Sequence, residues 1–531
     1  MIEDIEESKK LLLQKIKNKI GSPVSIDVVV ATLESLGIKS ENVQNDFGYN
    51  DSWELSKYIY QELTLNVETD IKNEKQLEDE NQTTEKNRRI SLSAYLFFKQ
   101  YFLSTSYLLA FAIQLTSIIT YGFSIYIYTG FNHVQSTVVV LGIIIGMIIS
   151  GGFIQVIGNQ ASKHFYLKDY ELVQKMTFSL LKKGCIFIIS SIFILFCINL
   201  IIPFYPIKTA LLIGAYAFWV GLLFLVFAPL HVVKNRKIIL LATLLATGIC
   251  LPLVNNPFLN LYQLHFIGLI IAISTVMLFL IIYFKIKIKH SQPSKIKFQK
   301  GAIFYTNIHS FQYGILINLF FFIDRIVAWS STEVGNFFMP IYYEKDYEIG
   351  MDISIIFFLF LAGILEYGNT SLFNLLNDQK NKTRFNNLKR YKKKVRLLYF
   401  KNLSIIFISS IPIYLIILYI FYGNWGYNYF FAESLKAINI KVANIGVLGY
   451  LFLCCGMLNS SYLLSLKKQK EVLQILSMSC VINLTFGLLF SRLLSYEDSV
   501  FGMLIASIFF TIVSFKENIK VYKNIDYYAT Q

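Results

Sequence analysis

The sequence is poor in charge and in proline. Only 16% of its 531 residues are Asp, Glu, Lys or Arg, and it has 9 prolines. Soluble domains carry about a quarter of charged residues, so a soluble protein is excluded for most of the chain. The apolar residues, 55% of the total, gather in runs of about twenty, the length that crosses a hydrocarbon core. The sequence therefore predicts an all-α polytopic membrane protein.

Catalytic and metal-binding motifs are missing as well. The chain has no Gly-x-x-x-x-Gly-Lys-Ser/Thr loop for ATP, no His-Glu-x-x-His and no Gly-x-Ser-x-Gly. Its 6 histidines are scattered, and its 6 cysteines lie in or beside apolar runs without the paired spacing of a metal site. We therefore expect a protein that is not an enzyme and that uses no metal or cofactor.

The charges that are present are unevenly distributed. Residues 1–90 carry a net charge of −6 and residues 91–531 a net charge of +21, which together give the +15 of the whole chain. The basic excess lies in short loops between apolar runs, where it indicates membrane orientation and not nucleic-acid binding. We expect the lipid bilayer, and no nucleic acid, to be a partner.

Twelve apolar runs are predicted to cross the bilayer. Lys and Arg cluster before the first run and after each even-numbered run, whereas the odd-numbered loops are nearly free of them. The positive-inside rule then places both termini in the cytoplasm. The runs are 105–128, 136–158, 184–204, 208–230, 238–255, 262–284, 302–323, 352–371, 402–422, 441–463, 471–491 and 499–515.

A basic linker over 285–300 divides these runs into two groups of six. Residues 101–284 and 301–515 are predicted to form two six-helix bundles around a central cavity, the arrangement of transporters that rock one half against the other. Because the halves show no clear sequence match, an accidental six-plus-six division is the alternative. Residues 516–531 are expected to be a cytoplasmic tail.

The first 100 residues have a different composition. Apolar positions at helical spacing predict a small cytoplasmic helical domain over 1–70, which we expect to dock a cytoplasmic partner. Asp51 and Ser52 precede its last helix; a helix cap explains them better than a carrier-protein attachment site. The polar segment 71–100 is predicted to be a linker and the membrane entry.

Asp324 and Arg325 are the main candidate functional residues, because ionisable groups in a span are expensive and mark functional sites. They stand at the predicted end of the seventh span and could gate the path or couple it to an ion. The alternative is a helix end at the interface with Arg325 extended toward water. The loop after them is predicted to be the longest outer loop, and it is net acidic.

Weaker candidates are polar residues elsewhere in the spans. Glu366, near the inner end of span eight, and His309, in span seven, are possible proton sites. Gln155 and Asn318 are candidates for lining the cavity. For these amides, hydrogen bonding between helices is the alternative explanation.

Several segments resemble PelG-type exporters, which move the Pel exopolysaccharide. The similar segments are Gly-Gly-Phe-Ile-Gln at 151–155, Tyr-Leu-Lys-Asp-Tyr-Glu-Leu-Val at 166–173, and Phe-Phe-Ile-Asp-Arg-Ile-Val-Ala-Trp at 321–329. The last one matches the Asp-basic-x-x-x-Trp signature of that family. Two features depart from the family pattern: residues 1–90 have no counterpart, and Arg325 stands where Lys is expected.

The resemblance implies a function and partners. The family belongs to the multidrug/oligosaccharidyl-lipid/polysaccharide (MOP) superfamily, so it implies export of an amino-sugar polymer across the bacterial inner membrane. It also implies a cytoplasmic glycosyltransferase and companion membrane subunits of a polysaccharide synthase as partners.

Three other functions stay open. A flippase for lipid-linked oligosaccharide would need Arg or Lys in the cavity, and few spans hold any. A membrane-embedded transferase would need sizeable folded outer loops, and most of those here are short. A scaffold subunit that only anchors a synthase would need neither.

Overall fold

The structure is a computed structural model. It describes residues 2–21, 23, 25–38, 43, 47–63, 95, 97–99, 101–102, 106–289, 307–331, 339–380, 388–423, 426–431 and 433–523. The chain divides into two units, Met1–Phe98 and Lys99–Gln531. The predicted linkers 71–100 and 285–300 and the end of the predicted tail 516–531 lie largely outside the described residues.

The N-terminal unit is helical. Its helices are α1 (Ile2–Ile20), α2 (Ile26–Ser35) and a helix over 52–63. Apolar residues three and four positions apart give each helix one apolar face, and these faces pack together. The buried side chains of this small core are Leu12, Ile16, Val29, Leu33, Val43, Leu55, Ile59 and Leu63.

Long apolar helices make up the second unit. Ten are long enough to cross a bilayer, and two shorter apolar helices, α5 and α9, bring the total among the described residues to twelve. Helices prevail because lipid offers no hydrogen-bond partner to the backbone, so each span must satisfy its own N–H and C=O groups. The all-α, twelve-helix prediction is confirmed.

The helices form two bundles of six. The first bundle contains α5 (Ser106–Tyr121), α6 (His133–Tyr166), α7 (Tyr170–Ile201), α8 (Ile207–Val232), α9 (Lys237–Cys250) with η1 (Leu251–Leu253), and α10 (Leu261–Lys289). The second contains α12 (Ile308–Trp329), α13 (Lys345–Lys380), α14 (Leu388–Tyr422), α15 (Tyr427–Phe431), α16 (Ala437–Ser465), α17 (Gln469–Leu493), η3 (Tyr496–Ser499) and α18 (Val500–Lys523).

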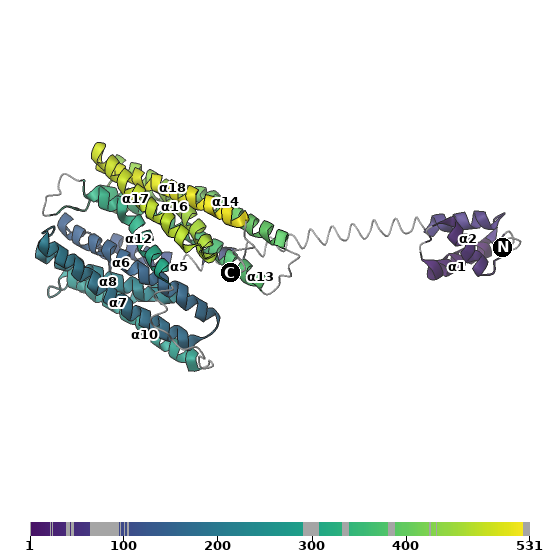
Figure 1. Cartoon of the computed structure of the whole chain (residues 1–531), viewed down its shortest axis with the longest axis horizontal. Coiled ribbons are helices and arrows are strands. Elements are labelled where there is room, and N and C mark those ends of the chain that lie inside the picture. Colours follow the sequence, from purple (N-terminus) through teal and green to yellow (C-terminus); the bar gives the residue numbers. More distant parts are fainter. Residues whose placement is uncertain are drawn as a thin grey trace. The chain divides into compact units, whose positions relative to one another are not determined.

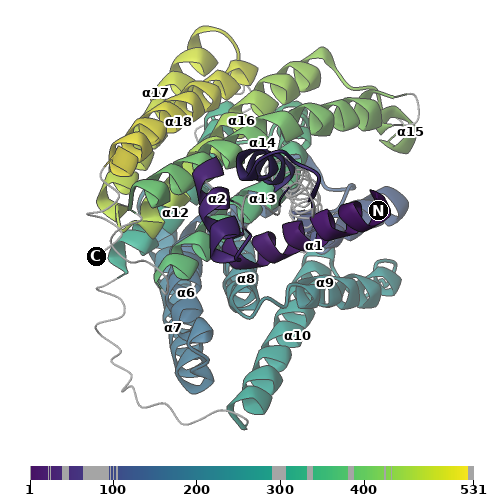
Figure 2. The same cartoon turned by 90° about the vertical axis from the view of Figure 1, so that its right-hand side faces the viewer.

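The bundles lie side by side. Helices α6, α7, α8 and α10 gather on one side, and α14, α16, α17 and α18 on the other (Figure 1). The view turned by 90° shows the same separation (Figure 2). Helix α12 lies between them, because it packs on α6 of the first bundle and on α17 of the second.

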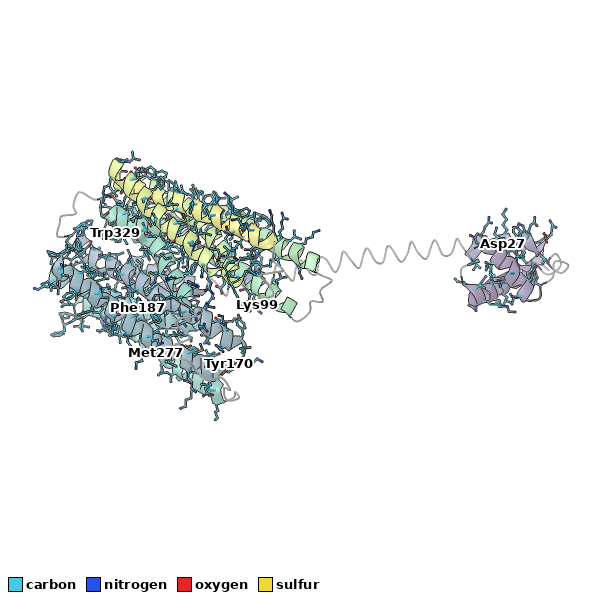
Figure 3. The ribbon with its side chains drawn as sticks, viewed as in Figure 1. Asp27, Lys99, Tyr170, Phe187, Met277 and Trp329 are labelled. Atoms are coloured by element: carbon cyan, nitrogen blue, oxygen red, sulfur yellow. The ribbon has the colours of Figure 1, made fainter. Side chains whose placement is uncertain are left out.

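Two ends of the bundles can be distinguished by charge. We call the end with the α6–α7, α8–α9 and α16–α17 turns the basic end, and the other the opposite end. Lys168, Lys234 and Lys467 follow the helices at these three turns with positive φ angles of 59°, 58° and 61°. A lysine there is favoured because its ammonium group lies near the negative C-terminal end of the helix dipole. In Figure 3, Tyr170 and Trp329 lie toward different ends.

Some predicted boundaries are wrong. The first span was predicted over 105–128, but α5 ends at Tyr121 and Gly122 turns the chain with a φ of 67°. The residues after it fold back, with a bridge between Phe123 and Tyr128. Gln114 fixes this turn, since its Oε1 accepts from Ile125 N (3.2 Å) and its Nε2 donates to Thr247 on α9 (2.7 Å).

Helix α13 also begins earlier than predicted. Its first residue is Lys345 and not residue 352, and α12 continues to Trp329. Asp346 and Glu348, which were predicted to lie in the outer loop before residue 352, are therefore helical. Charged residues lowered the local hydropathy and hid the start of the helix.

The two bundles touch most closely where α6 crosses α12. A Cβ atom on Gly314 would lie 2.2 Å from the carbonyl oxygen of Gly151, and one on Gly151 would lie 2.5 Å from that of Gly314. Real Cβ atoms do not approach a backbone oxygen so closely. The absence of both side chains therefore allows the two backbones to meet.

We expect Gly314→Ala to destabilise the protein by about 1–3 kcal/mol, the usual cost of overpacking, because the new methyl group must push α6 away. Thermal unfolding of the purified chain in detergent measures the effect. Gly158→Ala, on the same helix as Gly151, is the matched control because a Cβ there would meet nothing within 4 Å. Equal unfolding temperatures for the two variants would show that the crossing is not tightly packed.

Candidate functional site

A buried ion pair joins α12 to α13. Arg325 is 1% exposed, and its Nε donates to both carboxylate oxygens of Glu348, at 2.9 and 3.1 Å. Its Nη1 donates to the carbonyl oxygen of Phe321 (3.0 Å) and to the Tyr450 hydroxyl of α16 (3.3 Å). The Phe322 ring centroid lies 5.5 Å from the guanidinium carbon. Arg325 is therefore held by three helices and is not extended toward water.

Asp324 makes a parallel contact with the same helix. Its side chain is fully buried, and its Oδ2 accepts a hydrogen bond from the Tyr347 hydroxyl at 2.9 Å. Two consecutive residues of α12, Asp324 and Arg325, thus bind two consecutive residues of α13, Tyr347 and Glu348. We call these four residues with Tyr450 the charged node.

Some polar atoms of the charged node have no partner among the described residues. These are Oδ1 of Asp324 and Nη2 of Arg325. Unpaired polar atoms in a protein interior are costly, so such a site favours a water molecule, a proton or a ligand. The node is therefore not satisfied by protein atoms alone.

Asp352 lies next to the charged node and adds to its negative charge. It follows Glu348 by one turn of α13, which places both on one face of the helix. Its side chain is exposed, in contrast to Asp324 and Glu348. Three carboxylates then face one guanidinium, a net charge of −2 when all are ionised. Because isolated charge is expensive within a membrane, this arrangement is suited to taking up a proton or a small cation.

Further charges surround the opposite end of the second bundle. Lys436 donates to Asp346 (2.6 Å), and Lys345 donates to Glu433 (2.8 Å). Glu344 lies just before α13, and burial together with the neighbouring Asp346 raises its pKa above the usual value. This carboxyl group therefore holds its proton to a higher pH than a free glutamate does.

Glu366 belongs to a second site, at the basic end. Its carboxylate binds both terminal nitrogens of Arg236, which precedes α9 in the first bundle. Glu366 follows Glu348 by eighteen residues on α13, which corresponds to about 27 Å along the helix. The structure thus keeps Glu366 and the charged node apart.

The remaining predicted residues lie at the basic half of α12 and at its crossing with α6. His309 is in the first turn of α12, about 22 Å along the helix from Asp324. Asn318 donates to the carbonyl oxygen of Gly314 (2.8 Å), and the Cβ of Gln155 lies beside Gly314. Gln155 and Asn318 therefore both lie at the contact between the bundles.

Five residues of these sites were not among the candidates: Tyr347, Glu348, Asp352, Tyr450 and Arg236. Tyr347 and Glu348 precede the predicted start of span eight, Asp352 stands at that start, and Tyr450 is an ordinary residue of an apolar run. An acid-rich turn directly preceding an apolar run could have indicated that α13 begins earlier. No sequence signal pairs Arg236 with Glu366, which lies 130 residues away.

Comparisons with known proteins identify the fold. No family model matches the sequence, and no curated protein matches it either. Solved structures do match: the eukaryotic MATE transporter AtDTX14 is 13% identical with a TM-score of 0.55, covering 81% of this chain and 99% of its own.

Two further structures give the same result. A MOP superfamily transporter from Pyrococcus furiosus is 13% identical, with a TM-score of 0.55 and coverage of 80% of this chain and 96% of its own. The Vibrio cholerae MATE transporter VcmN is 13% identical, with a TM-score of 0.55 and coverage of 82% and 98%. At this identity the likeness establishes the fold. The chain is a multi-pass membrane protein with the fold of MATE transporters of the MOP superfamily.

Proposed function

We propose that this chain exports an exopolysaccharide, an amino-sugar polymer of the Pel type, from the cytoplasm through a bacterial inner membrane. The fold supports transport as its activity. The observation that carries the finer proposal is the charged node, because Asp324 and Arg325 belong to the segment 321–329 that resembles PelG-type exporters. Trp329 of that segment is fully buried and packs at 5.4 Å against the Tyr343 ring.

Asp324 and Arg325 are proposed to couple transport to a proton or cation. In the described residues 106–289 of the first bundle the only acids are Asp169 and Glu171, both at the basic end. An ion that drives transport therefore finds its carboxylates in the second bundle. The free Oδ1 of Asp324 and the exposed Asp352 are the groups available to receive it.

The node also bears on the flippase alternative. A lipid pyrophosphate needs a cationic side chain in the cavity, but Glu348 and Tyr450 already bind Nε and Nη1 of Arg325. Only Nη2 of Arg325 is left without a partner among the described residues, and three carboxylates lie around it. The negative charge of the node therefore favours an uncharged or cationic polymer over a lipid-linked anionic substrate. Under this proposal both termini are cytoplasmic, and residues 1–70 dock a cytoplasmic glycosyltransferase that acts with companion membrane subunits.

Deleting the gene for this chain in its host should abolish extracellular polysaccharide. Complementation with wild type should restore the polymer, and complementation with Asp324→Asn should not. The amide keeps an oxygen that accepts from Tyr347 but cannot exchange a proton, so the helix contact survives while coupling is lost. Sugar analysis of the culture supernatant measures the polymer, and immunoblotting of membranes confirms normal levels of each variant.

Glu517→Gln is the control for this experiment. Glu517 pairs with Lys520 within α18, so its loss should leave secretion at the wild-type level. Undiminished polymer after deletion would exclude polysaccharide export. Normal secretion by Asp324→Asn would exclude coupling at Asp324 and leave export itself intact.

Glu348→Gln should lower the free energy of unfolding by about 3–5 kcal/mol, the cost of leaving a buried charge without its partner. Asp352→Asn, one turn away and exposed, should change it by less than about 1 kcal/mol or raise it slightly, because it removes repulsion between carboxylates. Thermal unfolding in detergent compares the two. A similar loss in both variants would mean that burial of the Arg325–Glu348 pair does not determine stability.

A further inference from the structure

The ion pair between Arg236 and Glu366 joins the two bundles at the basic end. Arg236 stands in the short turn between α8 and α9, and Glu366 on α13. Nη1 of Arg236 donates to Oε2 of Glu366 at 2.5 Å, and Nη2 donates to Oε1. The side chains are 17% and 31% exposed. Such a bidentate ion pair requires a defined orientation of the α8–α9 turn relative to α13.

A second contact supports the ion pair. Tyr166, the last residue of α6, packs against Phe373 of α13 with 5.0 Å between ring centroids. The ammonium group of Lys234 lies 4.9 Å from the centre of the Tyr166 ring. The α8–α9 turn thus reaches α13 directly through Arg236 and indirectly through Lys234 and Tyr166.

At the opposite end, neutral hydrogen bonds connect the two bundles. Thr137 of α6 accepts a hydrogen bond from the backbone N–H of Tyr343 (3.0 Å), and Tyr205 donates to the carbonyl oxygen of Ile341 (2.8 Å). These bonds are neutral, and neutral hydrogen bonds are roughly half as strong as charge-assisted ones. The salt bridges found at this end, such as Lys436–Asp346, stay within the second bundle.

We propose that Arg236 and Glu366 form a latch that holds the basic end closed and must open to admit the substrate. This rests on the proposed transport function. The bundles meet at Gly151 and Gly314, so separation at the basic end pivots about that crossing. Because the neutral contacts are weaker, the latch biases the resting protein toward closure at the basic end.

Removing one charge should shift the ratio of open to closed protein at the basic end on the order of tenfold or more, the equivalent of one hydrogen-bonded ion pair. Hydrogen–deuterium exchange of the full chain in nanodiscs, without substrate, measures this. Glu366→Gln and Arg236→Gln should each speed exchange in peptides around the α8–α9 turn and the second half of α13. The charge-swapped double variant, Arg236→Glu with Glu366→Arg, should restore slow hydrogen–deuterium exchange.

Glu517→Gln is the control, because it breaks an ion pair at the basic end that lies within one helix and should leave exchange unchanged. Faster hydrogen–deuterium exchange in both single variants, with slow exchange restored in the charge-swapped variant, supports the latch. Unchanged rates in the single variants, or fast exchange in a charge-swapped variant that is folded, overturn it.

A reducible cross-link tests whether the latch must open. Arg236 and Glu366 meet only at the tips of long side chains, so cysteines at these positions are too far apart for a direct disulfide and need a bifunctional reagent. Arg236→Cys with Glu366→Cys, bridged in membranes by a bis-methanethiosulfonate, should stop secretion and recover it on reduction, whereas secretion by the cross-linked chain would overturn the proposal. The hydrogen–deuterium measurement requires no substrate. A latch that it confirms therefore stands even if polymer secretion does not depend on this chain.

Discussion

The Arg325–Glu348 ion pair is the interaction on which the second bundle depends. A guanidinium within a membrane must be neutralised where it lies, and this requires Glu348 of α13, the Phe321 carbonyl of α12 and Tyr450 of α16 to meet around it. These contacts fix the positions of three helices relative to one another. The neighbouring bond from Tyr347 to Asp324 then fixes the rotation of α13 about its axis.

The first bundle is built differently. Its membrane helices are held by apolar packing, by close contacts at glycines such as Gly146 against Gly221, and by neutral bonds such as that between Tyr216 and His265 (2.8 Å). Without acids in its interior it offers few places for an ion. The two bundles therefore differ: the interior of the first is apolar or neutral, and the second carries the buried carboxylates.

The sequence predicted what hydropathy controls. Twelve apolar helices, their division into two bundles and the positions of most of them follow from the apolar runs, because a run that crosses the lipid must be about twenty residues long. It also located Asp324 and Arg325, since charges in a span are rare. It missed Glu348 because the same charges that form the node lower the hydropathy of the start of α13. It missed Arg236 because its partner is set by the packing of the bundles, which no local pattern encodes.

One helix connects the charged node with the latch. Glu348 and Glu366 lie on α13, about 27 Å apart, with helical hydrogen bonds between them. A helix of this length moves nearly as a rigid body, so a shift of α13 that separates Glu366 from Arg236 also displaces Tyr347 and Glu348 unless α12 moves with it. Since Arg325 and Asp324 bind α12 to α13 strongly, α12 and α13 should move together, and the seam between α6 and α12 must then absorb the motion. In the proposed cycle, ion uptake at Asp324 weakens the hold on α13 and so changes the stability of the latch at the far end of the same helix.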